Sequence, residues 1–296
     1  SSSLKIYNNK SLAYQNNRMN IIGLYGESGF VGTHFQSTLK KIDNNSQIYL
    51  LPHRGSPHEI KIALKNFDAI NTHGNHKSIL YLAENNDIAS ANKLGVQHIK
   101  KNIERLQFIL SNTKSKIIYA SSVSVYGDLT ESPHHTEEIL KASNPYAHSK
   151  LECENLVLQS SGIVARLSNI YGVGMSDKNI ISDVIKQIKV GTIHPIKIIN
   201  GTPVRDMIHI SDVTSCLLAM TKTQEKGVYN VASGNNVSME SLAIMILKAA
   251  NTVEYTLVES NHDQSISCIS LDISKTRNTF NWSPYINLKN GLKELI

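Results

Sequence analysis

Cysteine is scarce in this chain of 296 residues, and the three that occur lie far apart. Cys153, Cys216 and Cys268 form no Cys-x-x-Cys pair, and three is an odd number. A disulfide framework uses paired cysteines, and a cysteine zinc site uses closely spaced ones. The sequence therefore argues against both, and we expect the cysteines to be reduced and structural.

Long apolar runs and long runs of one charge are also missing. No stretch approaches the ~18 consecutive apolar residues of a membrane span, and residues 1–20 lack the apolar block of a signal peptide. We therefore expect a cytoplasmic protein with no membrane contact. The net charge is +6, but the basic residues are dispersed as doublets such as Lys40-Lys41, so nucleic acid is not an expected partner. The twelve histidines form no ligand pattern such as His-Glu-x-x-His, and no metal is predicted.

Short apolar runs alternate with segments of helical periodicity through the first half of the chain. This alternation predicts an α/β fold, a Rossmann-type doubly wound parallel sheet. The expected strands cover residues 20–25, 47–51, 78–83, 116–121 and 163–167, and the expected helices residues 31–41, 91–110 and 146–159. Residues 52–77 give no clear pattern.

The organisation of the chain changes after residue 168, where turn residues become more frequent. We predict a polar extension at 1–18 and a dinucleotide-binding domain at 19–168, to which a strand at 227–232 returns. Residues 169–226 and 233–296 would form a smaller, interleaved substrate-binding part. Helices are expected within it at 180–190, 238–250 (capped by Ser238) and 288–296.

A glycine motif, Gly26-Glu27-Ser28-Gly29-Phe30-Val31-Gly32, follows the first strand and opens a helix. In that context small residues permit a tight turn, and the helix amides can bind a pyrophosphate. We therefore expect Gly26, Gly29, Phe30, Val31 and Gly32 to bind a dinucleotide. A Walker-type phosphate loop is excluded because no Lys-Ser or Lys-Thr follows the last glycine.

The residues after the second strand bear on the choice of dinucleotide. A carboxylate there would bind the adenosine ribose of NAD, but the chain has Pro52-His53-Arg54. Arg54 offers a cation for a 2′-phosphate, so we favour NADP over NAD, with His53 and Arg54 in the cofactor site. Alternatively, Arg54 is a loop residue that stacks on adenine.

Two further motifs can carry chemistry beside a dinucleotide. Ser122 ends an apolar run, where a parallel sheet presents its ligand-facing edge. Tyr146 and Lys150 are four residues apart, which places both on one face of a helix, and an ammonium near a phenol favours its ionised form. This spacing is common on helix surfaces. Here it lies on the helix that follows the strand ending at Ser122, and this position favours a catalytic role.

The chain resembles the extended short-chain dehydrogenase/reductases, the NAD(P)-dependent nucleotide-sugar epimerase/dehydratase family, over residues 19–296. The matching motifs follow the family's order: the glycine turn, Tyr81-Leu82-Ala83, Asn102, Ser121-Ser122-Val123-Ser124-Val125-Tyr126-Gly127, Tyr146 with Lys150, Arg166-Leu167-Ser168-Asn169-Ile170-Tyr171-Gly172, Arg205-Asp206-Met207-Ile208-His209-Ile210-Ser211-Asp212-Val213, and Leu271-Asp272-Ile273-Ser274-Lys275.

The resemblance implies a role for each matching residue. Ser122 would hydrogen-bond the reacting sugar oxygen, Tyr146 would act as acid or base, and Lys150 would bind the nicotinamide ribose. It assigns Leu82, Ala83 and Asn102 to the cofactor side, and Ser124, Asn169 and Arg205 to the substrate. Arg205 suits a diphosphate because a guanidinium can bind it through two hydrogen bonds, although an ion pair with Asp206 is an alternative.

Departures from the family's motifs narrow the choice of reaction that the chain is expected to catalyse. The 4,6-dehydratases have an Asp-Glu pair after the catalytic hydroxyl, where this chain has Val123-Ser124, so dehydration is not expected. The epimerase-reductases of the fucose-synthase type have a cysteine where this chain has Ser124. Glu84 stands where a small residue is usual, and it would either contact the substrate or face solvent.

These observations predict hydride transfer between NADP(H) or NAD(H) and C4 of a nucleotide-diphosphate sugar. We favour a 4-ketoreductase, with an NAD-dependent 4-epimerase as the alternative. A non-catalytic dinucleotide-sensing regulator is a remote third, because such proteins commonly lose the tyrosine and lysine kept here. The resemblance also implies a homodimer through the helices at 91–110 and 146–159.

Overall fold

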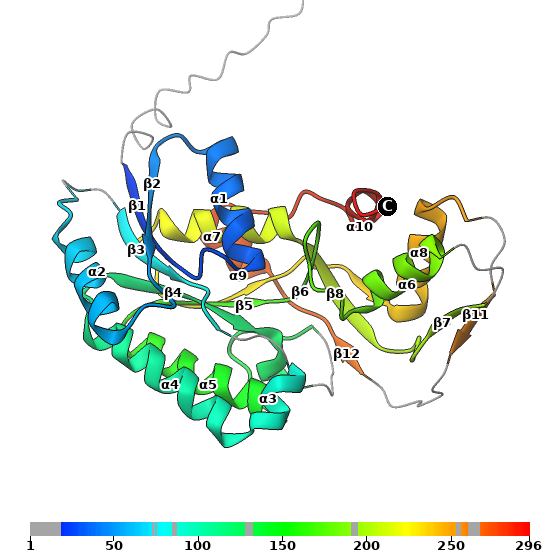
Figure 1. The fold of residues 1–296 in the computed structure, drawn as a ribbon. Coiled ribbons are helices and arrows are strands. Elements are labelled where there is room, and N and C mark those ends of the chain that lie inside the picture. The colour runs from blue at the N-terminus through cyan, green and yellow to red at the C-terminus, as the bar shows by residue number, and fades with distance from the viewer. Residues whose placement is uncertain are drawn as a thin grey trace, which may run out of the picture.

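The computed structural model describes residues 19–72, 74, 76–84, 88–127, 133–190, 195–252, 256–259 and 267–296. At its centre is a parallel six-stranded sheet in the order β2-β1-β3-β4-β5-β9 (Figure 1). The strands are β1 (Asn20–Tyr25), β2 (Ser46–Leu51), β3 (His76–Tyr81), β4 (Lys116–Ser122), β5 (Ile163–Leu167) and β9 (Gly227–Val231). The expected doubly wound sheet is confirmed, whereas the expected extension at 1–18 lies outside the described residues.

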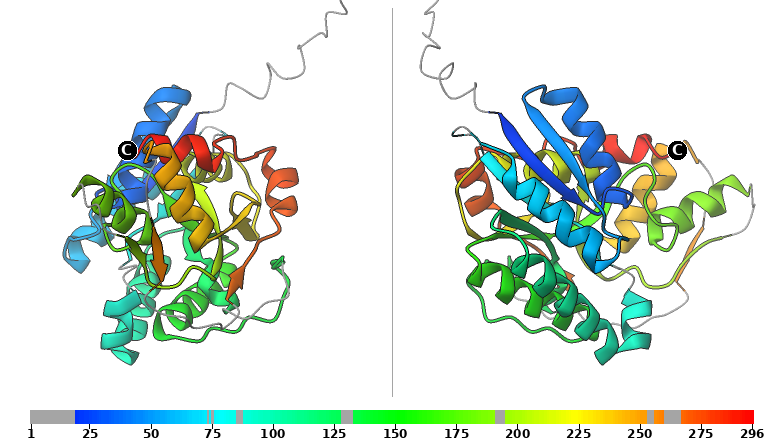
Figure 2. Two further views of the ribbon diagram at one scale, coloured as in Figure 1. Left: turned by 90° about the vertical axis from the view of Figure 1, so that its right-hand side faces the viewer. Right: turned by 60° about the vertical axis from the view of Figure 1, so that its left-hand side comes forward.

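Helices cover both faces of this sheet (Figures 1 and 2). One face packs against α1 (Phe30–Ile42) and α7 (Ile210–Thr221), and the other against α2 (Pro57–Ala69), α4 (Val96–Ser111) and α5 (Pro145–Gln159). Every residue of β1 and β5 is buried, as a sheet covered on both sides requires. The strand order reverses between β1 and β3, the position at which open α/β sheets bind ligands.

Two elements differ from the sequence prediction. The prediction of a single helix at 91–110 is wrong, because Gly95 takes a left-handed conformation (φ +54°) and separates α3 (Ile88–Leu94) from α4. Helix α2 lies in the unassigned segment. It begins with a capping box, in which the Ser56 hydroxyl accepts the Glu59 N–H and the Glu59 carboxylate accepts the Ser56 N–H.

A smaller part of the molecule extends from the carboxyl edge of the sheet and forms the right-hand side of Figure 1. Its strand β8 (Val204–His209) pairs with β6 (Asn169–Tyr171), β10 (Asn236–Ser238) and β12 (Cys268–Ile269), and β7 (Ile196–Ile198) pairs with β11 (Leu257–Glu259). Helices α6 (Ile180–Lys189), α8 (Met239–Ala249) and α10 (Leu288–Lys293) pack on a core that includes Tyr171 and Leu242. Ser238 caps α8, as expected. Helix α9 (Ser274–Phe280) packs beside β9.

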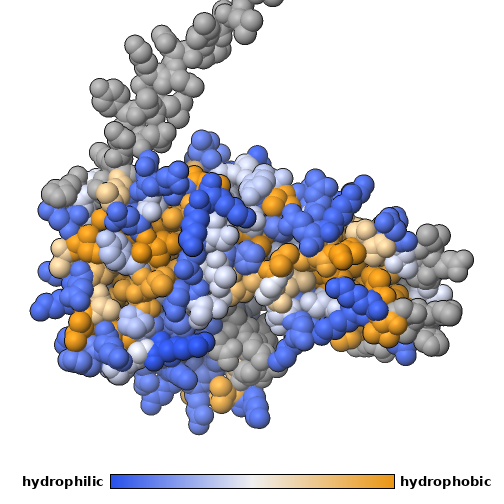
Figure 3. Space-filling model, turned by 45° about the horizontal axis from the view of Figure 1, so that its top comes forward, coloured by the Kyte–Doolittle hydropathy of each residue, from blue (hydrophilic) through white to orange (hydrophobic). Residues whose placement is uncertain are grey.

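The visible surface mixes hydrophilic and apolar side chains, and apolar ones gather on both the left-hand and the right-hand part in Figure 3. Within the residues that the structure describes, no helix combines the length and apolar character needed to cross a membrane.

Candidate active site

A cleft of about 700 Å³ opens where the strands β1, β3, β4 and β5 end, between the sheet and the smaller part. Most of the residues expected to act line it: Gly26, Gly29, Phe30, Val31, Gly32, Leu82, Ser122, Tyr146, Lys150, Asn169 and Arg205. Residues almost 180 positions apart in the sequence therefore meet in one cleft at the switch point of the sheet.

The glycine turn forms the wall of the cleft at the N-terminus of α1. Gly26 has φ +109°, and a Cβ there would lie 2.7 Å from the Ala83 nitrogen. A Cβ on Gly32 would overlap the carbonyl oxygen of Gly26. The first turn of α1 holds no acidic residue, so its amides present positive potential to the cleft. These features fit the pyrophosphate of a dinucleotide.

Tyr146 and Lys150 lie on the first turns of α5 and face the cleft beside Ser122. Asn144 caps this helix by accepting the N–H of Ala147 at 2.9 Å, and Pro145 opens it, so the sequence fixes where α5 starts. The Lys150 nitrogen lies 5.8 Å from the centre of the Tyr146 ring and donates to the Ala120 carbonyl at 2.8 Å. The Ser122 hydroxyl accepts the Ser124 N–H at 3.2 Å.

Glu84 does not face solvent, which corrects one of the two alternatives from the sequence. It lines the cleft, so its contact with a substrate stays a prediction. Its side chain is 2% exposed and forms an ion pair of 2.6 Å with Lys150. Both of its oxygens also accept the Tyr119 hydroxyl at 2.9 Å. Burial acts to lower the pKa of Lys150, but the Glu84 carboxylate, together with Tyr146 and Cys153, raises it, and the net pKa is above the ordinary value.

The side of the cleft formed by the smaller part carries Asn169 and Arg205. The Asn169 amide donates to the Asp206 carbonyl at 3.1 Å, and the Arg205 guanidinium donates to Ser267, at 2.6 Å to its hydroxyl. The Asp206 carboxylate instead accepts the N–H groups of Ser233 and Gly234, at 2.8 and 2.7 Å. The alternative of an Arg205–Asp206 ion pair is therefore not what the structure shows.

Five expected site residues lie outside the cleft lining: His53, Arg54, Ala83, Asn102 and Ser124. Ala83 is buried against Gly26. The buried Asn102 amide donates to Ser149 on α5 at 2.9 Å, so it holds the helix that carries Tyr146. The hydroxyl of Ser124 is buried and has no hydrogen-bond partner within the described part of the chain.

Sequence reasoning missed a carboxylate near the end of β2. Glu27, from the glycine turn, forms an ion pair of 2.9 Å with His53, two residues beyond the end of β2, whereas Arg54 is exposed. The sequence has no carboxylate at the end of β2, as expected. In the folded protein, however, Glu27 brings a carboxylate to this position from another loop. Only the meeting of two loops, 26 residues apart, brings Glu27 to this position.

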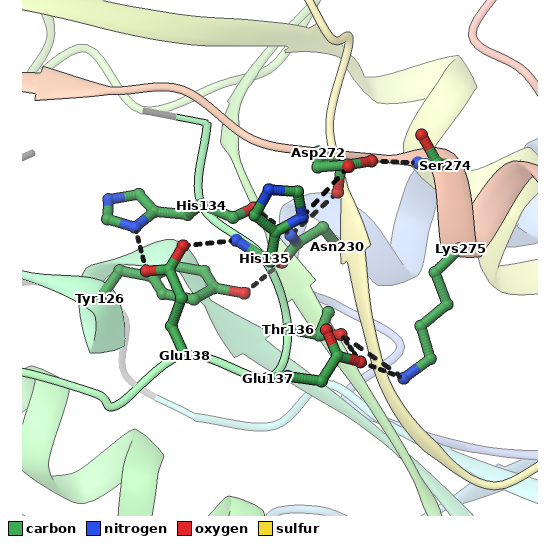
Figure 4. A network of polar contacts seen from close by, with 10 residues as sticks. All are labelled: Tyr126, His134, His135, Thr136, Glu137, Glu138, Asn230, Asp272, Ser274 and Lys275. Atoms are coloured by element: carbon green, nitrogen blue, oxygen red, sulfur yellow. Dashed lines mark hydrogen bonds and ion pairs between the residues drawn. The ribbon is translucent and has the colours of Figure 1, made fainter. Parts of the chain in front are cut away.

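A polar network holds Tyr126, which follows Ser122 in the chain (Figure 4). The Tyr126 hydroxyl, in the 3-10 helix that follows β4, donates to the Asn230 amide oxygen at 2.7 Å, and the Asn230 nitrogen donates to the carbonyls of His134 and Asp272. The His134 ring stacks on Tyr126 at 4.6 Å and pairs with Glu138. Three distant segments thus hold Tyr126, four residues beyond Ser122.

No cluster of metal-ligating side chains occurs in the described ranges. No disulfide joins the three cysteines, and Cys153 and Cys216 are buried.

Comparison with known proteins agrees with this geometry. The model of the NAD dependent epimerase/dehydratase family matches residues 22–232. GDP-6-deoxy-D-mannose reductase from Pseudomonas aeruginosa is 27% identical over 92% of this chain and 94% of its own length. UDP-glucose 4-epimerase from Dictyostelium discoideum is 26% identical over 74% of this chain and 73% of its own.

Among solved structures, that of RMD from Pseudomonas aeruginosa complexed with NADPH superposes with a TM-score of 0.82 at 25% identity, covering 94% of this chain and 97% of the other. These matches confirm the resemblance to the family, the expected fold, and the prediction of an enzyme that uses NAD or NADP. The chain belongs to the NAD dependent epimerase/dehydratase family.

Proposed function

We propose that this protein is a nucleotide-sugar 4-ketoreductase that transfers a hydride to C4 of a nucleotide-diphosphate sugar. The observation that carries the proposal is the single cleft in which the glycine turn, Ser122, Tyr146 and Lys150 meet. The reductase relative supports it, because its similarity covers nearly the whole of both chains.

The chain's own groups suit the proton side of this reaction. A reduced dinucleotide, when bound, supplies the hydride. The hydroxyls of Ser122 and Tyr146 would hydrogen-bond the substrate oxygen, and Tyr146 would donate its proton as that oxygen becomes an alcohol. Lys150 uses two of its three N–H donors on Glu84 and Ala120, so one remains for a ribose hydroxyl.

Asn169 and Arg205 would bind the substrate from the opposite side of the cleft. Lys178 also lines this side and adds positive charge. A diphosphate between the two parts of the molecule would place the sugar toward Tyr146. The Val123-Ser124 pair supplies no carboxylate near Ser122, which supports simple hydride transfer over dehydration.

The test is an assay of NADPH and NADH oxidation at 340 nm with nucleotide-diphosphate 4-keto sugars. We expect turnover with at least one of them. An epimerase, the alternative for which UDP-glucose 4-epimerase is the relative, would instead release a tightly kept NAD when the purified protein is denatured. No turnover with any of these sugars, together with reversible dinucleotide binding, would favour the sensing regulator.

We propose NADP(H) as the preferred cofactor, with Arg54 as the partner of the 2′-phosphate. The NADPH complex of a similar structure and the exposed arginine support this choice. The Glu27–His53 ion pair bears against it, because a carboxylate suits a ribose hydroxyl better than a phosphate. Comparing the two dinucleotides in variants of Arg54 and Glu27 separates these effects.

We also propose that the protein is a homodimer through α4 and α5. These helices pack side by side, and Ile103, Leu156 and Leu158 line a shallow hollow on their outer surface. Light scattering should give twice the chain mass of 32.8 kDa. Leu158→Glu should yield monomers, while Val190→Glu, at another exposed apolar position, should not. A wild-type protein that is monomeric at micromolar concentration would reject the dimer.

A further inference from the structure

Glu84 brings a buried carboxylate to the lysine of the expected catalytic pair. Its oxygen lies 2.6 Å from the Lys150 nitrogen, and the two side chains are 2% and 4% exposed. Glu84 also lines the cleft that holds Tyr146. A small residue is usual at this position in the family that the chain resembles, so the pair is a feature of this chain rather than an expected part of the site.

The ion pair changes the charge that Tyr146 faces. Lys150 alone would be a cation 5.8 Å from the centre of the Tyr146 ring and would favour loss of the phenol proton. With Glu84 in contact, the pair has no net charge. A phenolate would then face a neutral ion pair in place of an isolated cation, so the attraction that favours its ionisation is largely cancelled.

We propose that Glu84 is a positioning residue that offsets the charge of Lys150, so that Tyr146 keeps its proton and serves as the proton donor. This proposal rests on the proposed function and deepens it, because reduction of a ketone needs a protonated acid at the start of each turnover. The reverse reaction needs the base form. Glu84 therefore biases the site toward reduction.

The other titratable groups around the pair support this assignment of charge. They come from three elements that pack against it: Tyr81 from β3, Tyr119 from β4, and His98 and Arg105 from α4, together with Cys153 from α5 itself. Burial raises the pKa of Tyr81 and Tyr119 well above the ordinary value and that of Cys153 to about 12. Burial lowers the pKa of His98.

These four groups are therefore uncharged at neutral pH, and among the described residues Glu84 is the anion that pairs with Lys150. Arg105 is a cation, but it donates to the Ala83 carbonyl, and the same arginine is present in every variant below. A difference between variants at position 84 consequently reports the carboxylate.

The test is a titration of Tyr146 in the Glu84→Gln variant. The glutamine oxygen can still accept a hydrogen bond from Lys150, so the substitution removes the charge and keeps a partner. Absorbance at 295 nm, where tyrosinate absorbs, is recorded for each protein minus the same protein with Tyr146→Phe. We expect the midpoint to fall by about one pH unit or more, because an unopposed cation at this range has that effect.

Glu225→Gln is the matched control, since Glu225 is exposed beside the start of β9, at the opposite edge of the sheet, and the same charge is removed. Its midpoint should not move. An unchanged or higher midpoint in Glu84→Gln would overturn the proposal. If that variant does not fold by circular dichroism, Glu84→Ala, which admits water to Lys150, must show the same downward shift or the proposal is wrong.

This titration needs neither substrate nor cofactor, so its outcome is independent of whether the 4-ketoreductase assignment holds. Given turnover, the alkaline limb of the pH profile for reduction should move down by the same amount in Glu84→Gln. A lower midpoint without reductase turnover would leave the role of Glu84 in place and reject the proposed function instead.

Discussion

Glu154→Gln should destabilise the protein more than most single substitutions, because it leaves a buried arginine without its counter-charge. Glu154 lies on α5 one turn beyond Lys150, and its side chain and that of Arg166 are 1% and 3% exposed. The guanidinium contacts both carboxylate oxygens, from 2.8 to 3.3 Å, and the Ser121 hydroxyl donates to one of them at 2.5 Å.

The magnitude follows from the burial of the pair. Removing one partner of a buried ion pair costs about 3–5 kcal/mol. At ~2.1 cal/mol/K per residue, a chain of 296 residues has an unfolding entropy of roughly 0.6 kcal/mol/K, so Tm should fall by about 5–8 °C. Replacing both residues by methionine should recover most of this loss, because no uncompensated charge then remains.

Thermal unfolding followed by circular dichroism measures both effects. Glu225→Gln is the matched control, since Glu225 is exposed and lies outside the proposed α4–α5 interface, and the Tm of this variant should change by about 1 °C or less. A loss in Glu154→Gln no larger than that of the control would refute the reasoning. So would a double methionine variant that is less stable than the single one.

Arg54→Glu should weaken NADPH binding far more than NADH binding, whereas Glu27→Gln should strengthen NADPH binding relative to NADH binding. An unchanged ratio of the two dissociation constants in Arg54→Glu would show that Arg54 does not contact the 2′-phosphate. Gly32→Ala should abolish measurable dinucleotide binding by calorimetry, because the added methyl overlaps the Gly26 carbonyl and forces the turn to move; retained affinity would place the pyrophosphate elsewhere. Burial lowers the pKa of Lys116 from 10.5 to about 8. Between pH 8 and 10.5 this lysine is therefore protonated in the unfolded chain but largely neutral in the folded one, so its contribution to the free energy of unfolding rises with pH in this range. Lys116→Met should remove that rise in urea unfolding, and an identical pH dependence in both proteins would contradict it.

The parts of the site that depend on local spacing could be predicted from the sequence. The glycine turn needs small residues at fixed intervals, and Tyr146 and Lys150 share a face because of helical geometry alone. Helix α2 was missed although Ser56, Pro57 and Glu59 form a start signal. That signal was available in the sequence.

Other features could not be predicted, because they depend on where separate loops meet. Nothing near Glu84 in the sequence indicates that it points at Lys150, since the contact requires β3 and α5 to pack in one particular way. The Glu27–His53 ion pair likewise joins two loops at the end of the sheet. In both cases the residue type was visible and its partner was not.

The central claim is that Tyr146 transfers a proton beside a bound dinucleotide, and Tyr146→Phe tests it most directly. The ring still packs in the cleft wall, so only the transferable proton is lost. We predict a fall in kcat of ~10²–10⁴-fold on the nucleotide-sugar substrate. The dissociation constant of the dinucleotide, measured on the same preparation by fluorescence titration, should stay within about twofold. A kcat near that of the wild type would contradict the account.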